Sequence, residues 1–100
     1  MHVHIEGDEV LTCYLQGEID HHSAAYFRDT IDRQIERKQP KVVILDFSDV
    51  GFMDSSGVGL CMGRYRLLAQ TGAELRVQGA GGNIRRVFLL SGLNKLMSID

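Results

Sequence analysis

Serine, aspartate and glycine residues are concentrated in one segment, residues 48–59, which reads SDVGFMDSSGVG. The segment separates an apolar run from a stretch with helical spacing, so we expect it to follow a strand and open a helix. In open α/β sheets, ligand and partner sites lie beyond the carboxyl ends of the strands. Hydroxyls at a helix start also lie beside unpaired backbone amides and the positive end of the helix dipole, which tolerate a phosphate.

The two adjacent serines differ in their expected positions. We expect Ser55 to precede the helix and point outward, whereas Ser56 falls in its first turn. A phosphate on Ser55 would add a charge of about −1.5 to −2 beside Asp54 without disturbing the core. On a surface that must closely meet another protein, that charge would oppose docking. If one of the two serines accepts a phosphate, their positions favour Ser55 over Ser56.

A purely structural explanation of this segment is a helix N-cap made by Asp54, Ser55 or Ser56, worth about 1 kcal/mol. That explanation does not account for three glycines, at positions 57, 59 and 63. Each glycine inside a helix costs about 1 kcal/mol relative to alanine. Three of them indicate that something packs very close, either the sheet beneath or a partner protein above.

Hydrolytic chemistry is not favoured at these serines. A nucleophile elbow needs a glycine two residues before the serine, and positions 53 and 54 hold Met and Asp. The chain order of His22, Asp46 and Ser55 does not exclude a catalytic triad, but nothing else in the sequence supports one. We expect no enzymatic activity and no catalytic residue.

Metal and phosphate sites elsewhere are also not favoured. His21 and His22 diverge by about 100° if they lie on a helix, so they seldom bind one ion, and we expect no metal and no cofactor. The loop 79–82 reads GAGG but matches no phosphate-binding motif, which favours a flexible turn. Arg64 and Arg66 are expected on the solvated surface.

The composition of the chain excludes several other classes of protein. The chain has 100 residues, a net charge of −2 and 44% hydrophobic residues, which indicates one globular domain spanning 1–100. The apolar runs are too short for a membrane span, and no basic cluster indicates direct nucleic-acid binding. Cys13 and Cys61, without a secretory signal, are expected as reduced core thiols of a cytoplasmic protein.

The hydrophobic pattern predicts alternating strands and helices. Apolar alternation over 2–6 and 10–17 predicts an antiparallel hairpin. The run at 42–45 is apolar on both sides, which is typical of a central strand with both faces covered. The other expected elements are a helix over 21–38 with Asp20 as its N-cap and a buried stripe of Ala24, Phe27, Ile31 and Ile35, a loop over 46–54, a helix over 56–70, a strand over 74–78, a helix over 83–90, and a short edge strand within 96–99.

This order predicts an α/β fold, a single domain with a mixed β-sheet, an N-terminal hairpin and flanking α-helices. The sequence contains no linker and no internal repeat. Nothing in it shows a long apolar heptad or an uncovered apolar strand edge, so we expect the free chain to be a monomer.

Three motifs together resemble one known family. They are Gly17-Glu18-Ile19-Asp20-His21-His22, Asp54-Ser55-Ser56-Gly57-Val58-Gly59 and Gly63-Arg64-Tyr65. These motifs are similar to those of the anti-sigma factor antagonists, and the similarity covers nearly the whole chain. The resemblance implies the STAS fold and a regulatory protein without catalysis of its own. It is strongest to members that act positively on sporulation-specific transcription.

The resemblance also implies partners and residue roles. The partners would be an anti-sigma factor with serine kinase activity, which the unphosphorylated chain binds and thereby frees the sigma factor, and a serine phosphatase that resets the switch. Ser55 matches the phosphorylated serine, and Asp20 matches an acid that lies near it. Asp54, Ser56 and the segment 57–59, which reads Gly57-Val58-Gly59, match the surface that contacts the kinase.

One other function stays open on the residues alone. A module of the same fold could sense a small anion or a nucleotide near Gly57 and the loop 79–82. Family members usually continue into a last helix beyond the position of Ile99, whereas this sequence ends at Asp100. We expect the core to be complete without that helix.

Overall fold

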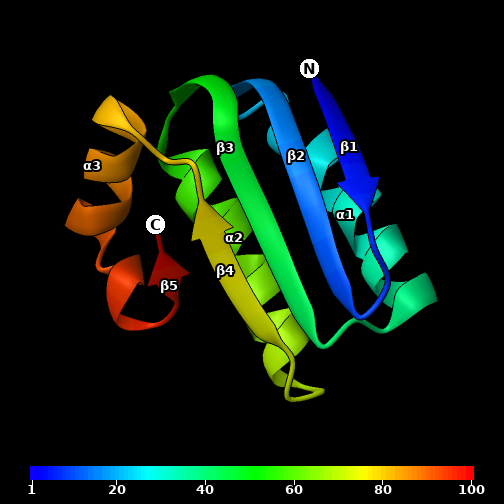
Figure 1. Cartoon of the computed structure of the whole chain (residues 1–100). Coiled ribbons are helices and arrows are strands. Elements are labelled where there is room, and N and C mark those ends of the chain that lie inside the picture. The colour runs from blue at the N-terminus through cyan, green and yellow to red at the C-terminus, as the bar shows by residue number, and fades with distance from the viewer.

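The computed structural model describes residues 1–100 and contains one five-stranded sheet in the order β1-β2-β3-β4-β5 (Figure 1). β1 pairs with β2 antiparallel, and every later pair is parallel. The predicted hairpin and mixed sheet are therefore confirmed. The strands are β1 (His2–Glu6), β2 (Val10–Ile19), β3 (Val42–Met53), β4 (Glu74–Gln78) and β5 (Ser98–Ile99).

The helices cover one face of the sheet and leave the other open. Figure 1 shows α1 (Ala24–Lys38) and α2 (Ser55–Ala69) side by side behind the strands, with α3 (Gly82–Ser91) beside the edge formed by β4 and β5. The expectation that 42–45 is covered on both faces is wrong. Val43 and Leu45 are fully buried, but Val42 and Ile44 on the open face are only partly buried.

β3 is much longer than the sequence pattern predicted. The expected loop over 46–54 is wrong, because the strand continues to Met53. Phe47, Val50 and Met53 are buried on the helix side. Two register irregularities in the pairing with β2 break the strict alternation of side chains, which explains why a period of two does not reveal this half of the strand.

α1 is shorter at its start than predicted. Of the expected stripe, Phe27, Ile31 and Ile35 are buried and Ala24 is only partly buried. The helix begins at Ala24 and not at 21. Asp20 is therefore not its N-cap, and the residues between them form a turn. The predicted edge strand exists as β5, which follows a short 3₁₀ helix, η1 (Leu93–Lys95).

The core is continuous and aromatic at its centre. Phe47 from β3 and Phe88 from α3 meet edge to face with ring centroids 5.1 Å apart. Both rings are fully buried, which fixes α3 against the strand that leads to the serine segment. None of the helices combines the length and the apolar character that crossing a bilayer requires.

Both cysteines are buried, and burial raises the pKa of each thiol to about 12. We predict that Cys13 and Cys61 resist iodoacetamide in the native protein at pH 8 and react after unfolding. Because the folded pKa lies above the unfolded value near 9, each thiol stabilises the fold below pH 9, and this contribution falls as the pH rises toward 12. Mass spectrometry of the alkylated protein measures the resistance to iodoacetamide. Rapid alkylation of either thiol in the native protein would contradict the prediction.

Candidate functional site

Asp54 joins the end of the sheet to the start of α2. Its backbone N–H donates to the carbonyl oxygen of Ile19 at the end of β2, at 3.1 Å. Its Oδ1 accepts from the backbone N–H of Ser56 at 2.7 Å, and its carbonyl oxygen accepts from that of Gly57 at 3.0 Å. Asp54 is therefore the N-cap of α2, one of the three candidates that the sequence offered.

Ser55 and Ser56 follow the cap and differ in their exposure to solvent. Ser55 is exposed, and Ser56 is partly buried. The expectation that Ser55 precedes the helix is wrong by one residue, because Ser55 is the first residue of α2. At this position its side chain still lies beside the free amides of the first turn.

Asp20 forms a turn at the end of β2 instead of capping α1. Its Oδ1 accepts from the backbone N–H groups of Ser23 and His22, both at 2.9 Å. The bond from the Ser23 N–H is the main reason that the pKa of Asp20 lies below its usual value, so this partly buried residue carries an ionised carboxylate at neutral pH. Because Ile19 pairs with Met53 in the sheet, Asp20 and Asp54 leave neighbouring strands at the same edge.

The three glycines of α2 differ in how much space surrounds the position of a missing Cβ. A Cβ on Gly57 would lie 2.2 Å from the Cγ and Sδ atoms of Met53, so any larger residue there would force the Met53 side chain to move out of its place between helix and sheet. A Cβ on Gly59 or Gly63 would meet nothing within 4 Å. The fold itself therefore gives no reason for these two glycines, each of which costs the helix about 1 kcal/mol relative to alanine.

Gly59 and Gly63 open a groove between α1 and α2. The groove encloses about 300 Å³, and Ser56 lies in its wall. Ser55 is not among its lining residues, so the groove runs along α2 from a point next to the exposed serine. The lining residues are Ala24, Arg28, Ser56, Gly59, Leu60, Gly63 and Arg64.

Arg64 is buried, which contradicts the expectation that it lies on the solvated surface. Its Nε lies 2.7 Å from Oδ1 of Asp32 on α1, and its Nη1 donates to the carbonyl oxygen of Leu60 at 3.4 Å. Partial burial raises the pKa of Asp32, and the charge of Arg64 offsets part of that effect. The pair links the two helices that form the groove. Sequence spacing within α2 could not reveal it, because the partner lies on another helix.

Phe52 is a surface residue that sequence reasoning missed. It lies two residues before the cap, and half of its surface is exposed. It pairs in the sheet with Glu18, close to the Asp20 turn. A large apolar side chain within a polar segment indicates an exposed contact residue. Phe52 was not identified as one because 46–54 was expected to be a loop.

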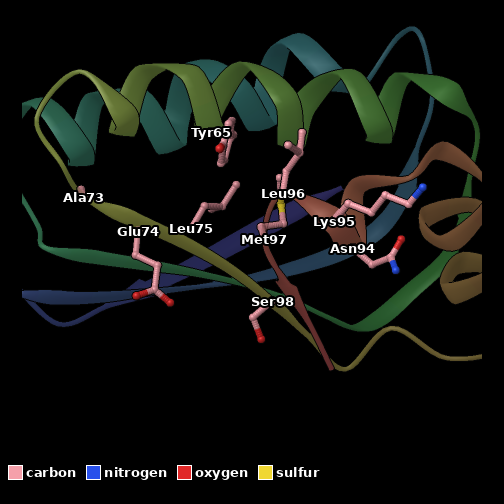
Figure 2. A pocket seen from close by; sticks show the side chains of 9 residues that line it. All are labelled: Tyr65, Ala73, Glu74, Leu75, Asn94, Lys95, Leu96, Met97 and Ser98. Carbon is pink, nitrogen blue, oxygen red and sulfur yellow. The ribbon is translucent and has the colours of Figure 1, made fainter.

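Cavities elsewhere do not support the predicted alternative ligand site. None of the four cavities is lined by Gly57 or by the loop 79–82. The largest, about 550 Å³, lies between Tyr65 of α2, Leu75 of β4 and Met97 near the C-terminus (Figure 2). Tyr65 is about 15 Å along the helix from Ser55, given a rise of 1.5 Å per residue. No cluster of three or more His, Cys, Asp or Glu residues could hold a metal ion.

We predict that Asp54→Ala lowers the free energy of unfolding by about 0.5–2 kcal/mol, because the N–H of Ser56 loses its acceptor. Asp54→Asn retains a side-chain oxygen and should recover most of that loss. Urea denaturation followed by circular dichroism measures both. Equal stability of the alanine variant and the wild type would contradict the capping role.

Known proteins are similar to this chain over nearly its whole length. The STAS domain model matches residues 3–100. An anti-sigma F factor antagonist of Paenibacillus polymyxa is 40% identical over 90 residues, which are 90% of this chain and 77% of the relative. An antagonist of the same name from Lysinibacillus sphaericus is 35% identical over 89% of this chain and 76% of the relative.

Solved structures agree with this match. The unphosphorylated form of the anti-sigma factor antagonist SpoIIAA has 33% identity and a TM-score of 0.85, covering 99% of this chain and 88% of that one. The phosphorylated form of the Bacillus protein SpoIIAA has 33% identity and a TM-score of 0.76, covering 99% and 91%. The family model, the sequence relatives and the five-stranded fold lead to one conclusion: this chain belongs to the STAS domain family.

Proposed function

We propose that this chain is an anti-sigma factor antagonist that phosphorylation of Ser55 switches off. The observation that carries the proposal is the placement of Ser55, exposed at the capped start of α2 directly after Asp54, whose N–H binds Ile19 at the start of the Asp20 turn. The names of the relatives from Paenibacillus and Lysinibacillus support the function. That SpoIIAA has been solved in both phosphorylated and unphosphorylated forms supports the switch.

The proposed partner is an anti-sigma factor with serine kinase activity. The unphosphorylated chain binds it and frees a sigma factor for sporulation-specific transcription, and a serine phosphatase later restores Ser55. This exchange takes place in the cytoplasm, and the free chain is a monomer. The contact surface comprises Asp20, Asp54, Ser55, Ser56, Val58 and Gly59, and Gly57, which is buried against Met53, shapes that surface from beneath.

Phosphorylation at this position should change folding little. The helix dipole and free amides favour an anion at the start of α2 by about 0.3–1 kcal/mol. Asp54 and Asp20 are nearby like charges that offset part of this gain. Phosphorylation should affect binding much more than folding, because burying an unpaired charge in an interface costs several kcal/mol. Each 1.4 kcal/mol lowers affinity about tenfold, so the loss amounts to a factor of hundreds or more.

We predict that the cognate kinase and ATP place one phosphate on Ser55. Phosphopeptide mapping by mass spectrometry of the wild type, Ser55→Ala and the matched control Ser56→Ala tests this. Ser56→Ala should accept phosphate and Ser55→Ala should not, because only Ser55 is exposed. Phosphate mainly on Ser56 or on Thr30 would contradict the assignment.

We also predict that Ser55→Asp keeps the native stability but binds the anti-sigma factor at least about a hundredfold more weakly than the wild type. Ser55→Ala should bind well and resist release by ATP. Isothermal titration calorimetry and thermal unfolding measure both properties. Tight binding by Ser55→Asp would argue against a switch based on charge at this residue.

A further inference from the structure

We propose that Phe52, at a free edge of β3, is the apolar anchor for an extended segment of the anti-sigma factor, which carries an apolar side chain next to lysine or arginine. This inference rests on the proposed function and adds a specific contact to the same complex. Half of the Phe52 surface is exposed, and the residue lies two positions before the cap of α2. A contact there holds the stretch of chain that leads directly into Ser55.

The exposure of Phe52 is built into the strand. Regular alternation along β3 from the buried Val50 would bury residue 52 and expose residue 53. Val50 pairs with Gly17, and Phe52 pairs with the very next residue of β2, so Gly51 is an extra residue in β3. As a result Met53 is buried and Phe52 is turned outward. Bulges of this kind re-aim a side chain and are frequent next to functional sites.

The same half of β3 has a free edge. β4 pairs with β3 only as far as Asp46, and Figure 1 shows β3 continuing past the end of β4. Gly79, with a φ of 74°, then turns the chain away toward α3. None of the turn, loop and cap hydrogen bonds of the backbone involves residues 49–53. The backbone groups on the side away from β2 therefore have no strand partner and can receive an extended segment by strand addition.

The charges around Phe52 indicate the chemistry of that segment. Asp49 on the same strand and Glu18 opposite Phe52 are both exposed, and neither takes part in an ion pair. Lysine or arginine beside an apolar side chain complements both carboxylates. A second copy of this chain on the same edge would instead bring like charges together. Because the two carboxylates already balance the cations of the segment, a phosphate on Ser55 would remain unpaired, as the proposed switch requires.

Substitution of Phe52 tests the anchor. Phe52→Ala should weaken binding of the anti-sigma factor by more than about tenfold, and Phe52→Leu, which keeps an apolar side chain, by less than about threefold. Leu89 on α3 is the matched control, because it is 47% exposed against 50% for Phe52. Leu89→Ala should change the affinity less than about twofold. Isothermal titration calorimetry measures the affinities, and thermal unfolding checks that each variant is folded. Equal affinities of Phe52→Ala and Leu89→Ala would overturn the proposal.

Charge reversal and hydrogen exchange test the surroundings of the anchor. Asp49→Lys should weaken binding about tenfold, and Glu36→Lys, at an exposed position of α1 that also has no ion pair, less than about twofold. Amides of residues 49–53 should exchange with deuterium more slowly in the complex than in the free chain, whereas those of β1 should not change. Equal effects of the two lysine variants, or unchanged exchange at 49–53, would count against this surface.

Phosphorylation kinetics separate this inference from the proposed function. Phe52→Ala should raise KM for phosphorylation of Ser55 and leave kcat within about twofold, because a binding contact is lost and the acceptor is unchanged. If the wild type does not bind the anti-sigma factor, the proposed function fails and this inference fails with it. If the wild type binds and is phosphorylated, and Phe52→Ala behaves identically, only this inference fails.

Sedimentation of the free chain tests the competing occupant. The wild type and Phe52→Ala should both sediment as monomers at micromolar concentration. A wild-type dimer that Phe52→Ala dissociates would assign the free edge to a second copy of this chain and overturn the proposal.

Discussion

The hydrogen bonds of Asp54 are the constraint on which the candidate site depends. Its N–H binds the end of β2, its carboxylate caps α2, and its carbonyl oxygen holds the first turn. These contacts place Ser55 at the edge of the sheet where Asp20 leaves β2. The close fit of Gly57 on Met53 then sets how near the helix lies to the sheet. Replacing any of these contacts would move the serine relative to its surroundings.

This anchoring explains how one residue could regulate a whole domain. Ser55 is exposed, but every residue that fixes its position belongs to the capped helix start or to the sheet. A charge added there meets solvent and free amides, so the core is not required to respond. The aromatic contact of Phe47 with Phe88 lies in that core and holds α3 independently of the serine. We therefore attribute the proposed switch to the surface and not to a second conformation.

Much of the fold could be predicted from hydrophobic periodicity. β1, β4 and the buried stripe of α1 agree with prediction, because each follows a regular period. The second half of β3 could not be predicted, since Ser48, Asp49 and Gly51 favour a turn in isolation. Only Asp49 of these three pairs with β2, and Ser48 and Gly51 fall where the register shifts. The segment around Ser55 was recognisable because its cap is local. The burial of Arg64 was not, because it depends on packing against another helix.

The most direct test of this account is a comparison of backbone NMR spectra of the unphosphorylated chain and the chain phosphorylated on Ser55. We predict amide shifts confined to the Asp20 turn, the first turns of α2 and the groove at Gly59 and Gly63. Amides of the central strand segment 42–45 and of β1 should stay unchanged. Widespread shifts that reach 42–45 and β1 would show a conformational switch and contradict the account.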